Sequence, residues 1–397
     1  MAHLLFLSWW WPYPANNGSK QRIYQLLRQL SRDDTVSLLS FAEANDATPE
    51  RIDHLRQFCA RVEAIPKPEY QSTTLKATLG YLSRWPRSLV DVYSPAMAAA
   101  IERLQQQTPV DFVIASELQT LRYLELLPQI PSILETPELT SFHDRVAQAP
   151  SNRSRLRAQL TLSKLENTLR TLLNRGVAMT VVSEVERYYL QRLAPPDGQI
   201  AVVPNGVDTN ANRPNPHAMP PPNTLIYSGA VTYDANYDAV DYFIHDVWPL
   251  VLNRVPQARF SVTGSTSPID VSHLAAHPGV TFTGYLPEVA PVLQNTWALV
   301  VPLRIGGGTR LKILEAMALG VPVISTPKGA EGLHVQDGKN ILLADNPAQM
   351  ADTICHLFAD PSQRARLIEN GRQLVEQEYD WSVISRQMQQ VMDRMKR

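Results

Sequence analysis

The sequence predicts an α/β protein of two domains, each built on a parallel β-sheet with helices on both faces. Three observations predict this class. The chain has 397 residues, more than one ordinary domain contains. Short apolar runs alternate with amphipathic helical patterns along its whole length. Between the two halves, residues 208–223 are rich in proline and poor in apolar side chains, which is typical of a surface linker.

The first half contains five short apolar runs that we predict as strands, because strands buried on both faces lack polar alternation. These runs are residues 4–6, 35–39, 112–114, 132–134 and 179–182. Apolar residues three and four positions apart predict helices between the strands. One such series is Ile23, Leu26, Leu27 and Leu30, and a second is Leu156, Leu160, Leu165, Leu169, Leu172 and Leu173. We expect each series to form one buried helical face.

The second half repeats the same alternation. Strands are predicted at residues 224–227, 259–263, 280–282, 298–301, 321–324 and 341–343. Helices are predicted at about residues 237–254, 309–319, 347–358 and 361–378. Two series of alternating strands and helices indicate two sheets, so the domain boundary is predicted at residues 204–205.

Composition excludes several classes of protein. Lys and Arg number 37 against 38 Asp and Glu, and this balance disfavours a dedicated nucleic-acid binder. Two cysteines are too few for a disulfide scaffold and favour a reducing compartment. No apolar run reaches the length of a membrane span, and the first residues lack the basic start of a signal peptide. We therefore expect a cytoplasmic protein.

The near-neutral total conceals a basic segment at residues 145–175. Its charged side chains are Arg145, Arg153, Arg155, Arg157, Lys164, Arg170 and Arg175 against Glu166 alone. Such a segment is either a solvated helix face or a contact for anionic lipid head groups or a phosphorylated acceptor. In the second case the protein would be peripheral at the inner membrane face.

Residues 302–326 contain the most informative motif, a strand, a glycine turn, a helix and a second strand. Gly306, Gly307 and Gly308 allow the backbone amides to approach a ligand closely, just before a helix whose N-terminus favours anions. Thr309, Arg310 and Lys312 add a hydroxyl group and two positive charges, and Glu315 follows one turn later. These residue types predict a diphosphate site, with Glu315 placed to accept hydrogen bonds from a ribose. The alternative is a glycine turn with two surface cations.

This stretch resembles the donor-site segment of retaining GT-B glycosyltransferases of the family 4 type. Further matches in the family's order are 203–208 (VPNGVD), 226–230, 260–265, 280–286, 325–332 and 378–382, and residues 14–19 resemble the acceptor-side loop. The resemblance covers nearly the whole chain and is closest to bacterial sugar transferases of exopolysaccharide clusters. It implies a GT-B fold, with two Rossmann-like domains facing a cleft. The first domain would comprise residues 1–204, joined by a final helix at about 380–397, and the second residues 205–379.

The resemblance also implies the site residues. Donor-binding residues would be Gly306, Gly307, Gly308, Thr309, Arg310, Lys312, Glu315, Tyr285, Leu286, Gly229 and Asn205, and the acceptor-side loop would supply Asn17, Gly18 and Ser19. No metal and no separate cofactor are implied, because the nucleotide-diphosphate sugar, a UDP- or GDP-sugar, is the substrate. The activity implied is transfer of its sugar, with retention of configuration, to a glycan, lipid-linked or small-molecule acceptor.

The sequence departs from the family's pattern at three places. Gly307 stands where the family often has a glutamate, and Ala230 and Asn236 stand near the positions of its Arg and Lys. Arg310 and Lys312 are candidates to take over the phosphates. Pro137 replaces the active-site His. The nearest polar candidates for a catalytic role are Glu135, Glu138 and His143.

Two other functions remain open from the sequence. A nucleotide-sugar 2-epimerase of the same architecture would isomerise the donor without an acceptor. A catalytically impaired nucleotide-sugar-binding protein would keep the fold and lose the transfer. The aromatic group of Trp9, Trp10, Trp11 and Tyr13 either stacks on a sugar or packs in the core.

Overall fold

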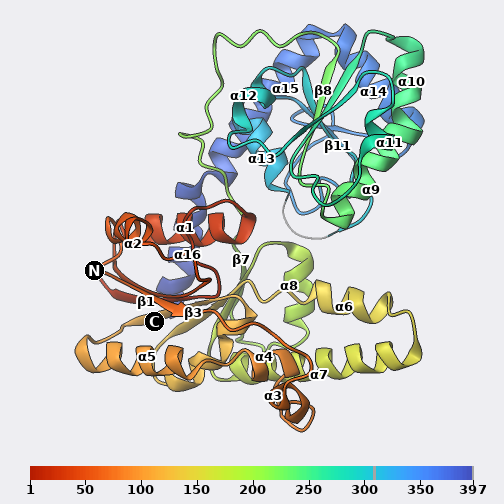
Figure 1. Ribbon diagram of the computed structural model, residues 1–397. Coiled ribbons are helices and arrows are strands. Elements are labelled where there is room, and N and C mark those ends of the chain that lie inside the picture. The colour runs from red at the N-terminus through yellow and green to blue at the C-terminus, as the bar shows by residue number, and fades with distance from the viewer. Residues whose placement is uncertain (307–309, 396–397) are drawn as a thin grey trace. The chain divides into compact units, whose positions relative to one another are not determined.

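The structure, a computed structural model, describes residues 1–306 and 310–395. The chain divides into two compact units (Figure 1), Met1–Pro204 with Ile384–Arg397, and Asn205–Val383. Each unit has one parallel sheet with helices on both faces, so the predicted α/β class of two parallel-sheet domains is confirmed.

The first unit has a seven-stranded sheet in the order β3-β2-β1-β4-β5-β6-β7. Its strands are β1 (His3–Ser8), β2 (Thr35–Ala42), β3 (Arg61–Pro66), β4 (Phe112–Ser116), β5 (Ser132–Glu135), β6 (Ala178–Val181) and β7 (Ile200–Val202). The helices are α1 (Gly18–Leu30), α2 (Pro49–Arg56), α3 (Leu75–Leu79), α4 (Arg87–Asp91), α5 (Pro95–Gln107), α6 (Thr140–Ala147), α7 (Asn152–Asn174) and α8 (Glu184–Gln191), with a 3-10 segment η1 (Leu118–Leu126). The last helix, α16 (Trp381–Met395), joins this unit from Ile384 onward.

The second unit has a six-stranded sheet in the order β10-β9-β8-β11-β12-β13. Its strands are β8 (Thr224–Ser228), β9 (Arg259–Thr263), β10 (Val280–Gly284), β11 (Ala298–Val301), β12 (Val323–Ser325) and β13 (Leu342–Leu343). The helices are α9 (Asp234–Tyr242), α10 (Trp248–Arg254), α11 (Ser272–Ala275), α12 (Ala290–Gln294), α13 (Leu311–Ala318), α14 (Pro347–Ala359) and α15 (Pro361–Leu374). Two π-helical turns, η2 (Phe243–Val247) and η3 (Val375–Tyr379), continue α9 and α15.

The sequence pattern explains why the central strands lie where they do. Leu4, Leu5, Phe6 and Leu7 of β1 are fully buried, since helices cover both faces of that strand. β1 pairs in parallel with β2 and β4, with Leu4 opposite Val36. A strand whose side chains are apolar on both faces is stable only inside a sheet that helices cover on both sides. This explains the interior position of β1 in its sheet.

Two strands were missed in the sequence, and both are edge strands. β3 begins with Arg61 and contains Glu63, while β7 has three half-buried residues. Arg61 and Glu63 interrupt the apolar pattern of β3, whereas β7 is a short apolar run that the prediction did not include. The helix predicted at 237–254 is interrupted by the π turn η2.

One helical face was predicted wrongly. Leu165, Leu169 and the later leucines of α7 are buried, but Leu156 and Leu160 are exposed. Heptad-like spacing identifies residues that share a helical side, but it does not fix where a neighbouring element covers that side.

Both sheets reverse their strand order at one point, between β1 and β4 in the first sheet and between β8 and β11 in the second. After β1 the chain builds β2 and β3 on one side and returns to place β4 on the other; after β8 it does the same with β9, β10 and β11. In such sheets, ligands bind at the carboxyl ends of the two strands where the order reverses. The loops after β1 and β4, and after β8 and β11, are therefore the positions where a site is expected.

Candidate functional site

A lysine and a glycine meet at the reversal point of the second sheet. Gly229 follows β8, and Lys312 lies in the first turn of α13, which follows β11. A Cβ atom on Gly229 would come within 2.7 Å of the Lys312 Nζ atom, so a glycine is required for this approach. The Lys312 ammonium donates to the Tyr227 hydroxyl at 2.9 Å and to Asn236 Oδ1 at 3.2 Å. The Lys312 side chain from α13 is thus held by a hydroxyl group from β8 and an amide oxygen from α9.

The environment of Lys312 favours the neutral amine. Burial, and after it the charge of Arg310, lower the pKa of Lys312 from 10.5 to about 7, while the carboxylate of Glu315 acts in the opposite direction. A bound anion would add to the effect of Glu315 and favour the ammonium form. The group is therefore half-protonated near neutral pH and gains most from a negatively charged ligand.

Arg310 organises the turn before α13. It is a buried side chain whose Nη2 donates to the Gly306 carbonyl oxygen at 2.8 Å. Gly306 has a φ of 98°, a conformation that favours glycine, and a Cβ there would lie 3.2 Å from the Ala235 side chain. The predicted residues Gly306, Arg310 and Lys312 are thus brought together beside the start of α9. Gly307, Gly308 and Thr309 lie outside the described residues.

The remaining predicted donor residues have different surroundings. Glu315 is half-buried on α13, one turn after the lysine. Tyr285 is exposed and Leu286 half-buried, and both follow β10 at the edge of the sheet rather than at its reversal point. Asn205 is the first residue of the second unit and is half-buried.

A strained glutamate occupies the reversal point of the first sheet. Glu117 directly follows β4 and has a φ of 74°, which is rare for a residue with a side chain. Its carboxyl group accepts a hydrogen bond from the Ser19 hydroxyl, in the first turn of α1. Burial, then the charges of Glu135 and Glu138, raise the pKa of Glu117 to about 8. This carboxyl group is therefore mostly protonated at neutral pH and can donate a hydrogen bond.

The predicted acceptor-side loop forms the start of α1. Asn17 is the N-cap residue, and its Oδ1 accepts from the Lys20 backbone N–H at 2.9 Å. Gly18 and Ser19 are the first helical residues. This cap fixes Ser19 against Glu117, a residue that the sequence did not single out. Its position immediately after a predicted strand was the available signal.

Glu135 has a positioning role rather than contact with a ligand. It is fully buried, and Oε1 accepts from Arg22 Nε while Oε2 accepts from Ser116 Oγ at 2.8 Å and from Thr136 Oγ1 at 3.0 Å. Arg22 in turn donates to the carbonyl oxygens of Val203 and Pro204 at 2.8 and 2.9 Å. The ion pair therefore fixes the chain at the end of the first unit, and both carboxylate oxygens are occupied.

Of the other two catalytic candidates, His143 packs between helices and Glu138 is exposed. The His143 ring stacks on Tyr189 at 4.2 Å, and its Nε2 lies 3.6 Å from a carboxylate oxygen of Glu166. Glu138 reaches solvent, and desolvation together with the charges of Glu186 and Glu135 raises its pKa. Among the three predicted candidates, Glu138 is the one at an exposed position.

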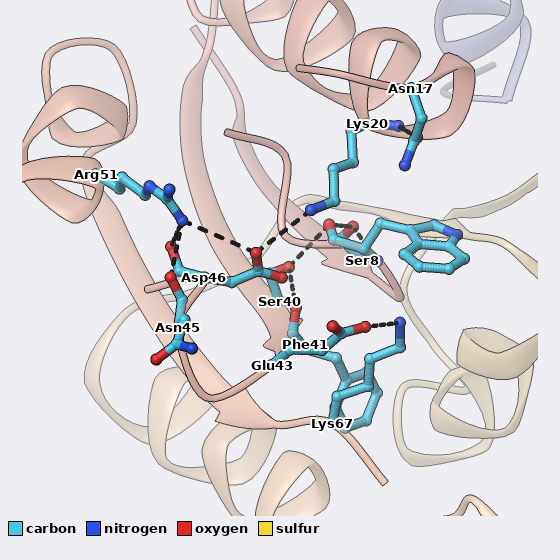
Figure 2. A network of polar contacts seen from close by, with 11 residues as sticks. Ser8, Asn17, Lys20, Ser40, Phe41, Glu43, Asn45, Asp46, Arg51 and Lys67 are labelled. Carbon is cyan, nitrogen blue, oxygen red and sulfur yellow. Dashed lines mark hydrogen bonds and ion pairs between the residues drawn. The ribbon is translucent and has the colours of Figure 1, made fainter. Parts of the chain in front are cut away.

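A polar network fixes the loops after β1 and β2 (Figure 2). Asp46 lies 3.4 Å from Lys20 Nζ, and the Arg51 guanidinium donates to the Asp46 and Asn45 carbonyl oxygens at 3.2 and 2.8 Å. Lys67 bonds to Glu43 at 3.0 Å and covers the Trp10 ring at 3.6 Å.

The aromatic group near this network is used in packing. Trp9 and Trp11 are buried in the core, and Tyr13 stacks on His54 at 3.9 Å. The alternative in which these rings form an open sugar platform therefore fails for Trp9 and Trp11. Within residues 1–306 and 310–395 no three His, Cys, Asp or Glu side chains gather as a metal site would require. Helices in the same part of the chain lack the length and hydropathy of a membrane span.

Two family models match the chain. The model described as Glycosyltransferase Family 4 matches residues 16–211, and the model described as Glycosyl transferases group 1 matches residues 222–360. Together they cover most of both units, including Ser19, Glu117, Gly229 and Lys312 at the two reversal points.

Curated relatives match part of their length. A GDP-mannose-dependent alpha-(1-6)-phosphatidylinositol monomannoside mannosyltransferase of Mycobacterium tuberculosis is 26% identical over 245 residues, which are 54% of this chain and 62% of that protein. A phosphatidyl-myo-inositol mannosyltransferase of Mycolicibacterium smegmatis is 23% identical over 270 residues, 65% of either chain. The matched region thus spans less than two thirds of either relative.

Solved structures share the fold over the whole chain. Sucrose-phosphate synthase from Thermosynechococcus elongatus has a TM-score of 0.69 at 19% identity and covers 100% of this chain and 99% of its own. Anabaena HepE in complex with UDP has a TM-score of 0.64 at 15% identity and covers 99% of this chain and 100% of its own. At these identities the likeness establishes the architecture.

Proposed function

Because the chain belongs to the glycosyltransferases of the family 4 type, which have the GT-B fold, we propose that it transfers a sugar from a nucleotide-diphosphate sugar to an acceptor. The donor would be a UDP- or GDP-sugar bound by the second unit. The relatives support such donors, since one is a GDP-mannose-dependent mannosyltransferase and one solved structure is a complex with UDP.

The observation that carries this proposal is the position of Lys312. Its Nζ lies 3.2 Å from Asn236 Oδ1. Asn236 is the residue that stands near the position of the family's usual lysine. A lysine from α13 therefore brings its ammonium group to the place where the α9 side lacks one. Together with Arg310 it supplies two positive charges next to the glycine turn, which is the charge needed for a diphosphate.

The proposed chemistry follows from this charge. Breaking the bond between sugar and diphosphate leaves negative charge on the leaving oxygen. Lys312 and Arg310, already held in place by Tyr227, Asn236 and the Gly306 carbonyl, would stabilise that charge without reorganisation. We propose that the reaction needs no metal ion, since these two cations take that role, and that configuration is retained at the anomeric carbon.

The acceptor would be bound by the first unit. Glu117, protonated near neutral pH, can donate to an acceptor oxygen, and the exposed Glu138 lies on the loop after the next strand. We propose that acceptors are glycan, lipid-linked or small molecules of exopolysaccharide synthesis. The enzyme would act in the cytoplasm, in part at the inner membrane face.

Calorimetric titration of the full chain with UDP and GDP tests the donor assignment. We expect binding of one of them, weakened by about 1–3 kcal/mol in the Arg310→Ala variant, the contribution of a charge-assisted hydrogen bond. Arg366→Ala, at an exposed position on α15, is the matched control. Equal affinity of R310A and the unchanged protein would contradict the assignment.

The three functions are separated by incubating the protein with candidate acceptors and with diphosphate sugars of whichever nucleotide binds. These functions are sugar transfer, 2-epimerisation and binding without catalysis. Transfer with an unchanged anomeric configuration, also in the presence of a chelator, supports the proposal. An epimerised sugar formed from the donor alone indicates the 2-epimerase, and tight binding with no turnover indicates the impaired binding protein.

A further inference from the structure

The first unit exposes an apolar and basic surface that the core does not use. We call it the α3–α7 surface and define it by its leucines and its basic side chains. Its members are Leu75, Leu79, Leu82, Leu156 and Leu160, with Lys76, Arg153 and Arg157. Figure 1 shows α3 lying beside α7, with α6 alongside the first turns of α7.

α7 has two different sides. The side carrying Leu162, Leu165 and Leu169 is buried against the sheet. Arg153, Arg157, Leu160 and Lys164 follow one another at spacings of four, three and four residues, which places them together on another side. Leu156 precedes Leu160 by one turn on the same side.

Lys164 shows which element this second side meets. Its Nζ donates to the carbonyl oxygens of Gly80 and Tyr81 at 3.0 and 2.8 Å, directly after α3. Further along, Thr168 and Thr171 line a small cavity with Trp85. The second side of α7 is thus covered by residues 80–85 from Lys164 onward, and uncovered before it. The uncovered part, Leu156 and Leu160, is therefore continuous with the end of α3.

The leucines of α3 are held outward by a defined scaffold. Thr74 caps the helix at the Ala77 N–H, and the Arg87 guanidinium donates to the Ala77 and Ser72 carbonyl oxygens at 2.8 and 2.6 Å. The exposed fractions are 75% for Leu75, 55% for Leu79, 90% for Leu82, 67% for Leu156 and 43% for Leu160. Five leucines exposed on adjoining segments form a patch of the kind that marks an interaction site.

Basic side chains dominate the charge around these leucines. Residues 71–91 and 152–165 contain Lys76, Arg84, Arg87, Arg153, Arg155, Arg157 and Lys164 against Asp91 alone, which is buried beneath the N-cap residue Thr74. Of the ion pairs formed within the described chain, none involves Lys76, Arg153 or Arg157. The surface therefore combines leucines with basic groups that are available to an anionic partner.

We propose that the α3–α7 surface docks on an anionic lipid bilayer, with the leucines in the head-group region and the basic side chains on the lipid phosphates. Exposed leucines surrounded by Lys and Arg are the composition that binds such an interface. This inference does not depend on the proposed sugar transfer. It also assigns half of the surface to residues 71–90, which the basic segment 145–175 does not include.

Sedimentation of the full chain with vesicles of phosphatidylcholine alone, or with added phosphatidylglycerol, tests the proposal. We expect binding to the anionic vesicles and its loss at high salt. Each basic side chain near an anionic surface strengthens binding by about fivefold, so Arg153→Gln with Arg157→Gln should weaken it roughly 25-fold. Leu79→Ser with Leu82→Ser should weaken it by roughly tenfold or more.

Two controls lie in the second unit, on exposed positions of α10 and α15. Leu250→Ser and Arg366→Gln repeat the same chemical changes and should leave vesicle binding unchanged. Circular dichroism and unchanged nucleotide affinity confirm that each variant is folded, and they separate this test from that of the proposed function.

Four outcomes would overturn the proposal. They are no vesicle binding, equal binding to neutral and anionic vesicles, equal losses in the control variants, and full binding by the double leucine variant. The last result would indicate a contact with soluble acidic polymers rather than insertion into a bilayer.

Discussion

The pH dependence of nucleotide binding is the sharpest test of Lys312. Its pKa is about 7, so the ammonium form is present at pH 6.5 and mostly lost at pH 8.5. Protonating it at pH 8.5 costs about 2 kcal/mol, which is 1.5 pH units at about 1.4 kcal/mol each. A charged hydrogen bond to a phosphate contributes about 1.5–3 kcal/mol. At pH 8.5 the cost of protonating Lys312 therefore nearly cancels the free energy gained from its hydrogen bond to the phosphate.

Lys312→Met should therefore weaken UDP or GDP binding by about 10- to 100-fold at pH 6.5 and by less than about fivefold at pH 8.5. Titration calorimetry at the two pH values measures both factors. Lys339→Met, at an exposed position of the second unit, is the control and should change neither affinity. A loss in K312M of the same size at both pH values would refute the reasoning, because it would show that the lysine is charged throughout.

Three further substitutions test the fold around the two sites. Glu117→Gln should raise the free energy of unfolding at pH 7 by up to about 3 kcal/mol and leave it nearly unchanged at pH 4, since the pKa of this carboxyl group rises from 4.5 to about 8 on folding and its ionisation in the unfolded chain above pH 4.5 then favours unfolding. Gly229→Ala should weaken nucleotide binding about tenfold, because its Cβ would lie 2.7 Å from Lys312 Nζ and displace it. Arg22→Met should lower the free energy of unfolding by about 3–5 kcal/mol in urea, since it leaves the Glu135 carboxylate buried without its cation.

Each of these has its own contradicting result. A gain in E117Q that is equal at pH 4 and pH 7 would show a packing effect rather than ionisation. Unchanged affinity in G229A would mean that the lysine does not contact the nucleotide. Arg56→Met removes an exposed ion pair and should cost less than about 1 kcal/mol, so a similar loss in both arginine variants would remove the case for a buried pair.

The fold could be predicted because its central strands are apolar on both faces, as in β1 and β11. The edge strand β3 was missed since Glu63 and Arg61 interrupt its apolar pattern. The glycine turn and Lys312 could be identified from residue types, but the contact between Lys312 and Asn236 depends on how α9 and α13 approach, which no local pattern contains.

The first-unit site was harder to predict for a related reason. Glu117 follows β4 and Glu135 ends the neighbouring strand β5, so the two look equivalent in the sequence. Arg22, 113 residues from Glu135, pairs with it and occupies its carboxylate, while Glu117 keeps a strained backbone and a hydrogen bond from Ser19. Which of two glutamates is available to a ligand is set by this long-range partner.

The two reversal points hold ionisable groups with opposite requirements. Burial at Lys312 disfavours a positive charge, so its contribution to stability falls as the pH drops from 10.5 to about 7. Burial at Glu117 disfavours a negative charge, so its contribution falls as the pH rises from 4.5 to about 8. At neutral pH both groups reduce the stability of the fold, as is common for residues kept for function. An anion relieves the first group and an uncharged oxygen satisfies the second, so a diphosphate suits the second unit and a hydroxyl group the first.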